Sequence, residues 1–103
     1  MKMQEVSVVR IYCTEGEHVL SDLMKRLHDE EQVRGVTVFR GISGFGQSGR
    51  MHSNSLIDLS LNLPLVLEFF DLPERVDEIL THLSDEIKPG RLLRWSAHMN
   101  ISE

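Results

Sequence analysis

Two segments of this chain place apolar residues on one side of a helix only, and they divide the sequence into strand–helix–strand–strand–helix–strand. The helical segments begin near Val19 and Pro73, and a helix with one apolar stripe buries one surface. The intervening segments, 6–13, 36–40, 63–70 and 93–101, are rich in β-branched or alternating apolar residues, as strands are. This order predicts an α+β fold, a βαββαβ sandwich in which two helices cover one face of a four-stranded antiparallel sheet.

Length and charge limit what such a chain can do. Its 103 residues suit a single domain spanning 1–103, and a net charge of −5 disfavours nucleic acid as a partner. No stretch approaches the ~18 apolar residues of a membrane helix. A single cysteine, Cys13, excludes an intrachain disulfide and fits a reducing cytoplasm.

Local signals define the second helix and the last strand. Asp71, Pro73 and Glu74 predict a capping box with proline in the first turn, and the glycine turn after Ile87 ends the helix. In the last strand, Trp95 lies on an apolar side that alternates with a polar side, so we expect the apolar side to be buried. The apolar side consists of Leu93, Trp95, Ala97, Met99 and Ile101.

The third strand has more apolar surface than two helices can cover. Leu63, Leu65, Leu67 and Phe69 alternate with Val66, Glu68 and Phe70, so both of its sides carry apolar residues. The first strand is apolar on both sides in the same way. Monomers rarely expose a contiguous apolar patch of this kind. We therefore expect the uncovered face of the sheet to pack against other copies of the chain; a lightly apolar exposed sheet is the alternative.

The densest unusual segment follows the second strand. It contains Gly41, Gly44, Gly46 and Gly49 between Arg40 and Arg50, and a second glycine turn near residue 90 adds two more cations, Lys88 and Arg91. Glycine-rich turns let backbone amides approach an anion, and arginine provides forked donors for phosphate or carboxylate. Either these segments bind a small anion, or they are simple turns with solvated basic residues.

The run Arg40-Gly41-Ile42-Ser43-Gly44-Phe45-Gly46, with the polar segment after it and the strand Leu63–Phe70, resembles an uncharacterised family of PII-like proteins. It is also similar to the start of the long loop between strands two and three of PII proteins, with one extra residue before His52. The resemblance covers nearly the whole chain in element order. It implies a ferredoxin-like fold, assembly as a homotrimer and a signalling role without catalysis.

PII proteins bind adenine nucleotides in clefts between subunits. Carried over by position, the resemblance implies that the ligand contacts two segments. One is the base of the loop, at Gly41, Gly44, Phe45, Gly46 and Gln47, and the other is the turn Lys88, Pro89, Gly90 and Arg91. It also implies that the loop over residues 46–62 contacts a transporter or an enzyme. Two departures from PII proteins are expected: the segment 46–62 contains no tyrosine, and the sequence as given has no basic segment after the last strand.

Histidine offers a competing interpretation of the same fold. The five histidines include no pair at i, i+4 and no H-x-H pair. This spacing indicates scattered surface residues and predicts no metal site. A divalent-cation-binding or purely structural trimer of the cation-tolerance type remains the alternative, with His52 as the best candidate ligand. No spacing supports a catalytic nucleophile, and no cofactor is expected.

Overall fold

The computed structural model describes residues 1–14, 18–45, 51–53 and 63–102. The strands are β1 (Met3–Thr14), β2 (Val36–Arg40), β3 (Ser43–Phe45), β4 (Met51–Ser53), β5 (Pro64–Asp71) and β6 (Leu92–Asn100). Helix α1 (Val19–Lys25) continues as a π-helical turn, η2 (Arg26–Glu30), and helix α2 (Pro73–Leu83) continues as a 3₁₀ turn, η3 (Ser84–Glu86). Among the described residues, no helix is both long enough and apolar enough to span a bilayer.

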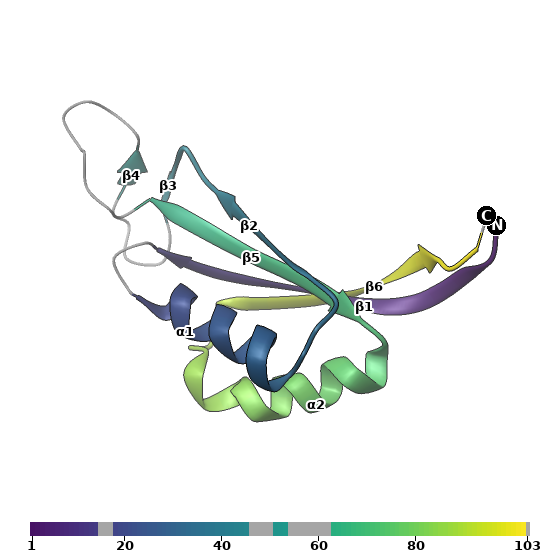
Figure 1. Cartoon of the computed structure of the whole chain (residues 1–103). Coiled ribbons are helices and arrows are strands. Elements are labelled where there is room, and N and C mark those ends of the chain that lie inside the picture. The colour runs from purple at the N-terminus through teal and green to yellow at the C-terminus, as the bar shows by residue number, and fades with distance from the viewer. Residues whose placement is uncertain (15–17, 46–50, 54–62, 103) are drawn as a thin grey trace.

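The main sheet has the predicted antiparallel arrangement. Its strand order is β2-β5-β1-β6, so the first and third long strands are central, and both helices lie on one side of it (Figure 1). Ile11 is paired with Leu67 of β5 and with Leu92 of β6, which fixes the register across three strands. The α+β sandwich predicted from the sequence is confirmed.

The core lies between this sheet and the two helices. Alternate residues of β1 and β5 point toward the helices and are buried, as period-two strands require. The apolar sides of the two helical segments pack against these strand residues. The core residues are Val9, Ile11, Leu23, Leu27, Leu67, Phe69, Val76, Ile79 and Leu83.

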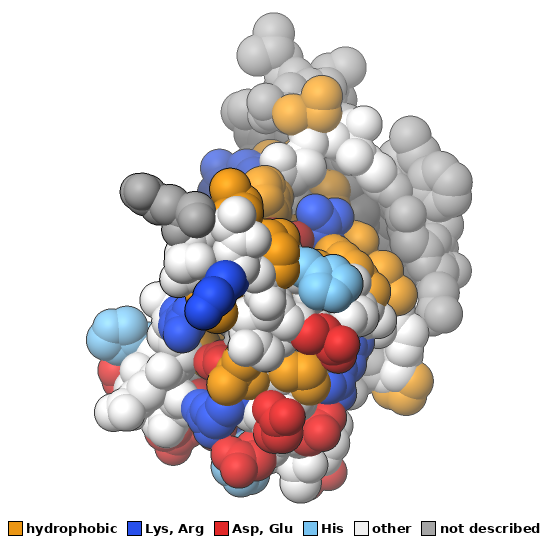
Figure 2. Space-filling model, turned by 90° about the vertical axis from the view of Figure 1, so that its right-hand side faces the viewer, with side chains coloured by type: hydrophobic (Ala, Val, Ile, Leu, Met, Phe, Trp, Pro, Cys, Tyr) orange, Lys and Arg blue, Asp and Glu red, His pale blue; other side chains and the backbone are white. Residues whose placement is uncertain are grey.

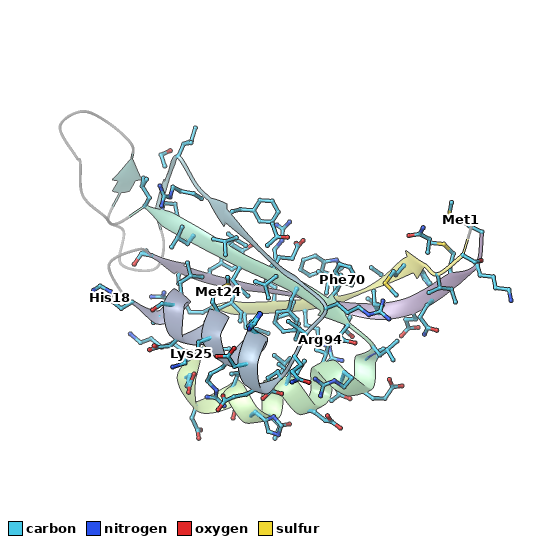
Figure 3. All side chains as sticks on the ribbon, viewed as in Figure 1. Met1, His18, Met24, Lys25, Phe70 and Arg94 are labelled. Atoms are coloured by element: carbon cyan, nitrogen blue, oxygen red, sulfur yellow. The ribbon has the colours of Figure 1, made fainter. Side chains whose placement is uncertain are left out.

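The opposite side of the sheet, which we call the open face, has no layer over it among the described residues. Five large side chains there, between 38% and 52% exposed, come from all four strands: Tyr12, Phe39, Phe70, Leu93 and Trp95. The predicted burial of the apolar side of the last strand is therefore wrong for a single chain. The polar side of β6 faces the helices because Arg94 binds α2, through Asp77 Oδ1 at 2.6 Å and the Pro73 carbonyl oxygen at 3.2 Å (Figure 3).

Two local predictions differ from the structure. Strand β5 extends to Asp71, which pairs with Ser7, so Asp71 cannot be the helix cap. The N-cap is Leu72, whose amide donates to Asp71 Oδ1 at 2.7 Å, and the predicted capping box is absent at this described helix start. The segment after β2, expected to be a loop throughout, contains the short antiparallel pair β3–β4.

Strands β1 and β6 extend beyond the rest of the sheet as a two-stranded ribbon. Pairing with β6 starts at Met3, whereas pairing with β5 starts only at Ser7. The Ile101 amide donates to the Lys2 carbonyl oxygen at 2.9 Å and closes the ribbon. Both termini lie at its tip, and β3–β4 lies at the opposite end of the molecule (Figure 1).

Candidate functional site

Arg40 is the last residue of β2 and lies at an edge of the sheet. It borders a groove of about 410 Å³ between β2 and α1, whose other lining residues are His18, Leu20, Ser21, Val38 and Leu65. Its lining combines three apolar side chains with a guanidinium, an imidazole and a hydroxyl group. This groove can take a ligand that has both an apolar and an anionic part.

The backbone of Gly41 is hydrogen-bonded to Pro64, the first residue of β5. Its amide donates to the Pro64 carbonyl oxygen at 2.7 Å. A Cβ atom at Gly41 would lie only 2.6 Å from Pro64 Cγ, whereas one at Gly44 would meet the same atom at an ordinary 3.6 Å. Position 41 therefore requires glycine because the two chain segments approach so closely there.

We expect Gly41→Ala to lower the free energy of unfolding by about 1–3 kcal/mol, since the proline ring cannot move aside freely and the strands must separate. Denaturant titration followed by circular dichroism measures this change. Gly35→Ala is the matched control, because a Cβ atom added at Gly35 would have no neighbour within 4 Å. Equal stability of the two variants would show that the contact with Pro64 is easily relieved.

The second predicted segment forms a tight turn before β6. Gly90 has φ 83°, a conformation that favours glycine, and the Arg91 amide donates to the Lys88 carbonyl oxygen at 3.2 Å. The Arg91 carbonyl oxygen in turn accepts the Tyr12 amide at 2.8 Å. The turn thus holds Lys88 and Arg91 at the end of β1, beside a pocket of only about 40 Å³.

The two cationic segments lie at the same end of the sheet but on opposite edges. Arg40 pairs with Leu65, which pairs with Cys13 of β1. On the other side of β1, the turn that ends at Arg91 bonds to Tyr12. Three strand spacings, or roughly 14 Å, separate β2 from β6. One chain therefore does not bring Arg40 and the Lys88–Arg91 turn together.

Other predicted residues are placed only in part. Phe45 pairs through its backbone with Met51, while Gly46, Gln47 and Arg50 lie outside the described residues. Sequence reasoning missed His18 as a neighbour of Arg40. Its φ of 58° at the start of α1 is visible only in the structure, so no sequence signal marked it.

Sequence reasoning also missed a polar cluster at the centre of the open face. Arg10 Nε donates to Glu68 Oε1 at 2.7 Å, and its guanidinium lies 5.8 Å from the Phe39 ring centroid and 5.6 Å from that of Trp95. Hydrogen bonds to Glu68 and then to Tyr12 raise the pKa of Arg10, so it stays charged. The sequence did contain a signal for this cluster: Arg10 and Glu68 are each flanked by apolar residues within a predicted strand.

The described histidines support no metal centre. His28 lies 2.7 Å from Asp29 and His82 lies 2.9 Å from Glu31, so each has one carboxylate neighbour. Within the described ranges, no three His, Cys, Asp or Glu residues are grouped as metal ligands would be. The side chain of His52, the candidate ligand named above, lies outside the described residues.

Comparison with known proteins gives sequence relatives over most of the chain. Residues 6–99 match the model of the DUF190 family, described as "Uncharacterized ACR". A UPF0166 protein of Methanocaldococcus jannaschii is 30% identical over 95 residues, which is 88% of this chain and 87% of the relative. Another UPF0166 protein, from Aquifex aeolicus, is 35% identical over 86 residues, covering 84% of this chain and 86% of that protein.

Solved structures show the same fold at low identity. CPII from Thiomonas intermedia K12, bound to ADP and bicarbonate, aligns with a TM-score of 0.70 and 19% identity over 95% of this chain and 91% of its own. The divalent ion tolerance protein CutA1 from Ehrlichia chaffeensis aligns with a TM-score of 0.60 and 8% identity over 95% and 84%. The ferredoxin-like, PII-like architecture is thereby confirmed.

Proposed function

Because the chain belongs to the DUF190 family and has a PII-like fold, we propose that it is a regulatory protein that binds an adenine nucleotide, or another small anion, between copies of itself. One observation carries the proposal. Arg40 and the Lys88–Arg91 turn lie at the same end of the sheet, on its two opposite edges. A ligand that uses both cationic segments needs a second chain.

The directions of the two edge strands allow such a cleft to form between neighbouring copies. Strand β2 runs parallel to β1 and antiparallel to β6, because each neighbouring pair in the sheet is antiparallel. If the β6 edge of one copy lies beside the β2 edge of the next, the antiparallel pattern continues. Arg40 of one copy then approaches the Lys88–Arg91 turn of its neighbour. Repeating this head-to-tail contact gives a ring when the rotation between neighbours closes, and the resemblance to PII proteins favours three copies.

The residues of this cleft suit a phosphorylated ligand. Arg40, Lys88 and Arg91 supply positive charge on an otherwise acidic chain. The groove beside Arg40 adds the apolar side chains of Leu20, Val38 and Leu65 for the uncharged part of the ligand. CPII, a structural neighbour, has been solved with ADP, AMP and bicarbonate, which supports a nucleotide as the first ligand to test.

The loop that follows Gly41 would carry the signal. A ligand held at Arg40 would lie next to Gly41, which is bonded to Pro64, and these two residues flank the segment 46–62 in the sequence. Binding there would favour one arrangement of the loop, and a partner protein, a transporter or an enzyme, would recognise that arrangement. This role needs binding and no chemical turnover.

Isothermal titration calorimetry with ADP, ATP, AMP and cyclic dinucleotides tests the proposal. We expect at least one of these nucleotides to bind, and Arg91→Ala to weaken that binding at least about tenfold, since a charge-assisted hydrogen bond to phosphate is lost. Glu78→Ala, on the outer side of α2, is the control and should bind as the unaltered chain does. Absence of binding to every nucleotide at millimolar concentration would overturn the proposal.

The fold likeness to CutA1 supports a second candidate, a divalent-cation-binding or purely structural trimer. In that case divalent ions, and not nucleotides, would raise the melting temperature. Adding metal salts to the same series of samples separates the two candidates.

A further inference from the structure

The centre of the open face is polar, although its surroundings are apolar. The Arg10–Glu68 ion pair lies on the two middle strands, and Phe39 and Trp95 come from the two outer strands. The Arg10 and Glu68 side chains are 39% and 24% exposed, so both are still in contact with water. An arginine held between aromatic rings is the kind of residue that dominates the binding energy of protein interfaces.

We propose that this ion pair forms the polar centre of the interface between copies of the chain and determines how their open faces pack. The inference rests on the self-assembly in the proposed function. It adds which residues of the open face control that assembly.

Charge complementarity identifies a second copy as the occupant. The pair carries one positive and one negative group, so an identical face offers a carboxylate to Arg10 and a guanidinium to Glu68. Arg10 has five N–H donors, which is more than its hydrogen bonds to Glu68 and Tyr12 use. The apolar side chains around the pair also continue to the edge strand β6 through Leu93 and Trp95. Identical faces are therefore complementary both in charge and in apolar surface. Figure 2, which views the molecule from the end that carries the termini, shows most of the acidic side chains in its lower part, where the helices lie.

Covering the pair changes its energetic role. In water, an exposed ion pair contributes little, and losing one partner is tolerated. Once neighbouring copies exclude water, a lone charge is strongly unfavourable, whereas replacing both charges by apolar groups is often neutral or stabilising. The pair should therefore matter little to one chain and strongly to the assembly, with a non-additive pattern between the two residues.

A double-mutant cycle measured by sedimentation equilibrium tests this. Arg10→Met and Glu68→Leu should each raise the chain concentration needed for half-assembly at least about tenfold, and the double variant should return to within about threefold of the unaltered chain. Arg75→Met with Glu78→Leu, an ion pair of 2.8 Å on α2, is the matched control and should leave assembly unchanged. Circular dichroism of each variant verifies that the single chain folds.

The outcomes separate the two proposals. If the unaltered chain is a monomer at all concentrations tested, both the assembly and this inference fail. If it assembles but the single variants assemble as well as the control, or the double variant is no better than the singles, only the inference is overturned. Nucleotide binding is read independently by calorimetry.

Discussion

Nucleotide binding lost in Arg40→Ala and in Arg91→Ala should return when the two variants are co-expressed. In the proposed ring, each cleft takes Arg40 from one copy and Arg91 from the next. A mixed ring therefore contains clefts in which both arginines are intact, one from each variant. Every mixed ring of three has one such cleft, so about a third of the clefts are restored in rings that contain both variants.

Calorimetry on mixed rings, purified through two different affinity tags, measures the restored fraction of sites. Each variant alone should bind at least about tenfold more weakly than the unaltered chain. Co-expressing two tagged forms of Arg40→Ala is the control, and it should restore nothing. If the mixed rings form but bind no better than this control, Arg40 and Arg91 do not contribute to the same cleft, and the proposed site is wrong.

Replacing Phe69 by alanine should lower the free energy of unfolding by about 3–5 kcal/mol, because a phenylalanine that is 1% exposed leaves a cavity in the core. Phe70 is the neighbouring residue but lies on the open face, where it is 40% exposed (Figure 3). We expect Phe70→Ala to change the stability of a single chain by less than about 1 kcal/mol.

Thermal unfolding at several chain concentrations distinguishes the two effects, since the melting temperature of a self-assembling chain depends on its concentration. Phe69→Ala should lower the melting temperature at every concentration. Phe70→Ala should instead reduce the concentration dependence. A loss of stability at Phe70 as large as that at Phe69 would show that the open face stabilises the fold of the single chain.

The fold could be predicted from the sequence because its signals are local. Helical stripes and strand alternation identify the elements, and two amphipathic helices leave one arrangement with a covered and an uncovered sheet face. The side to which the apolar residues of β6 point could not be predicted. Alternation separates Trp95 from Arg94, but only the contact of Arg94 with α2 shows which of them faces the helices.

The candidate site could be predicted as a set of residues but not as an arrangement. Glycine and arginine content indicated both cationic segments, yet their separation across four strands depends on strand order. The Arg10–Glu68 pair was missed because the two residues are 58 positions apart, and the antiparallel register of β1 and β5 alone makes them neighbours. Long-range pairing of this kind is not contained in local periodicity.

The ribbon formed by β1 and β6 has a practical consequence for labelling. Its tip carries both chain ends, at the opposite end of the molecule from β3–β4 and from the groove that Arg40 borders. A fluorescent protein or surface tether attached at either end therefore leaves ligand access unobstructed. Since the two ends are held beside each other by the bond between Ile101 and Lys2, a short peptide linker could also join them into a circularly permuted variant.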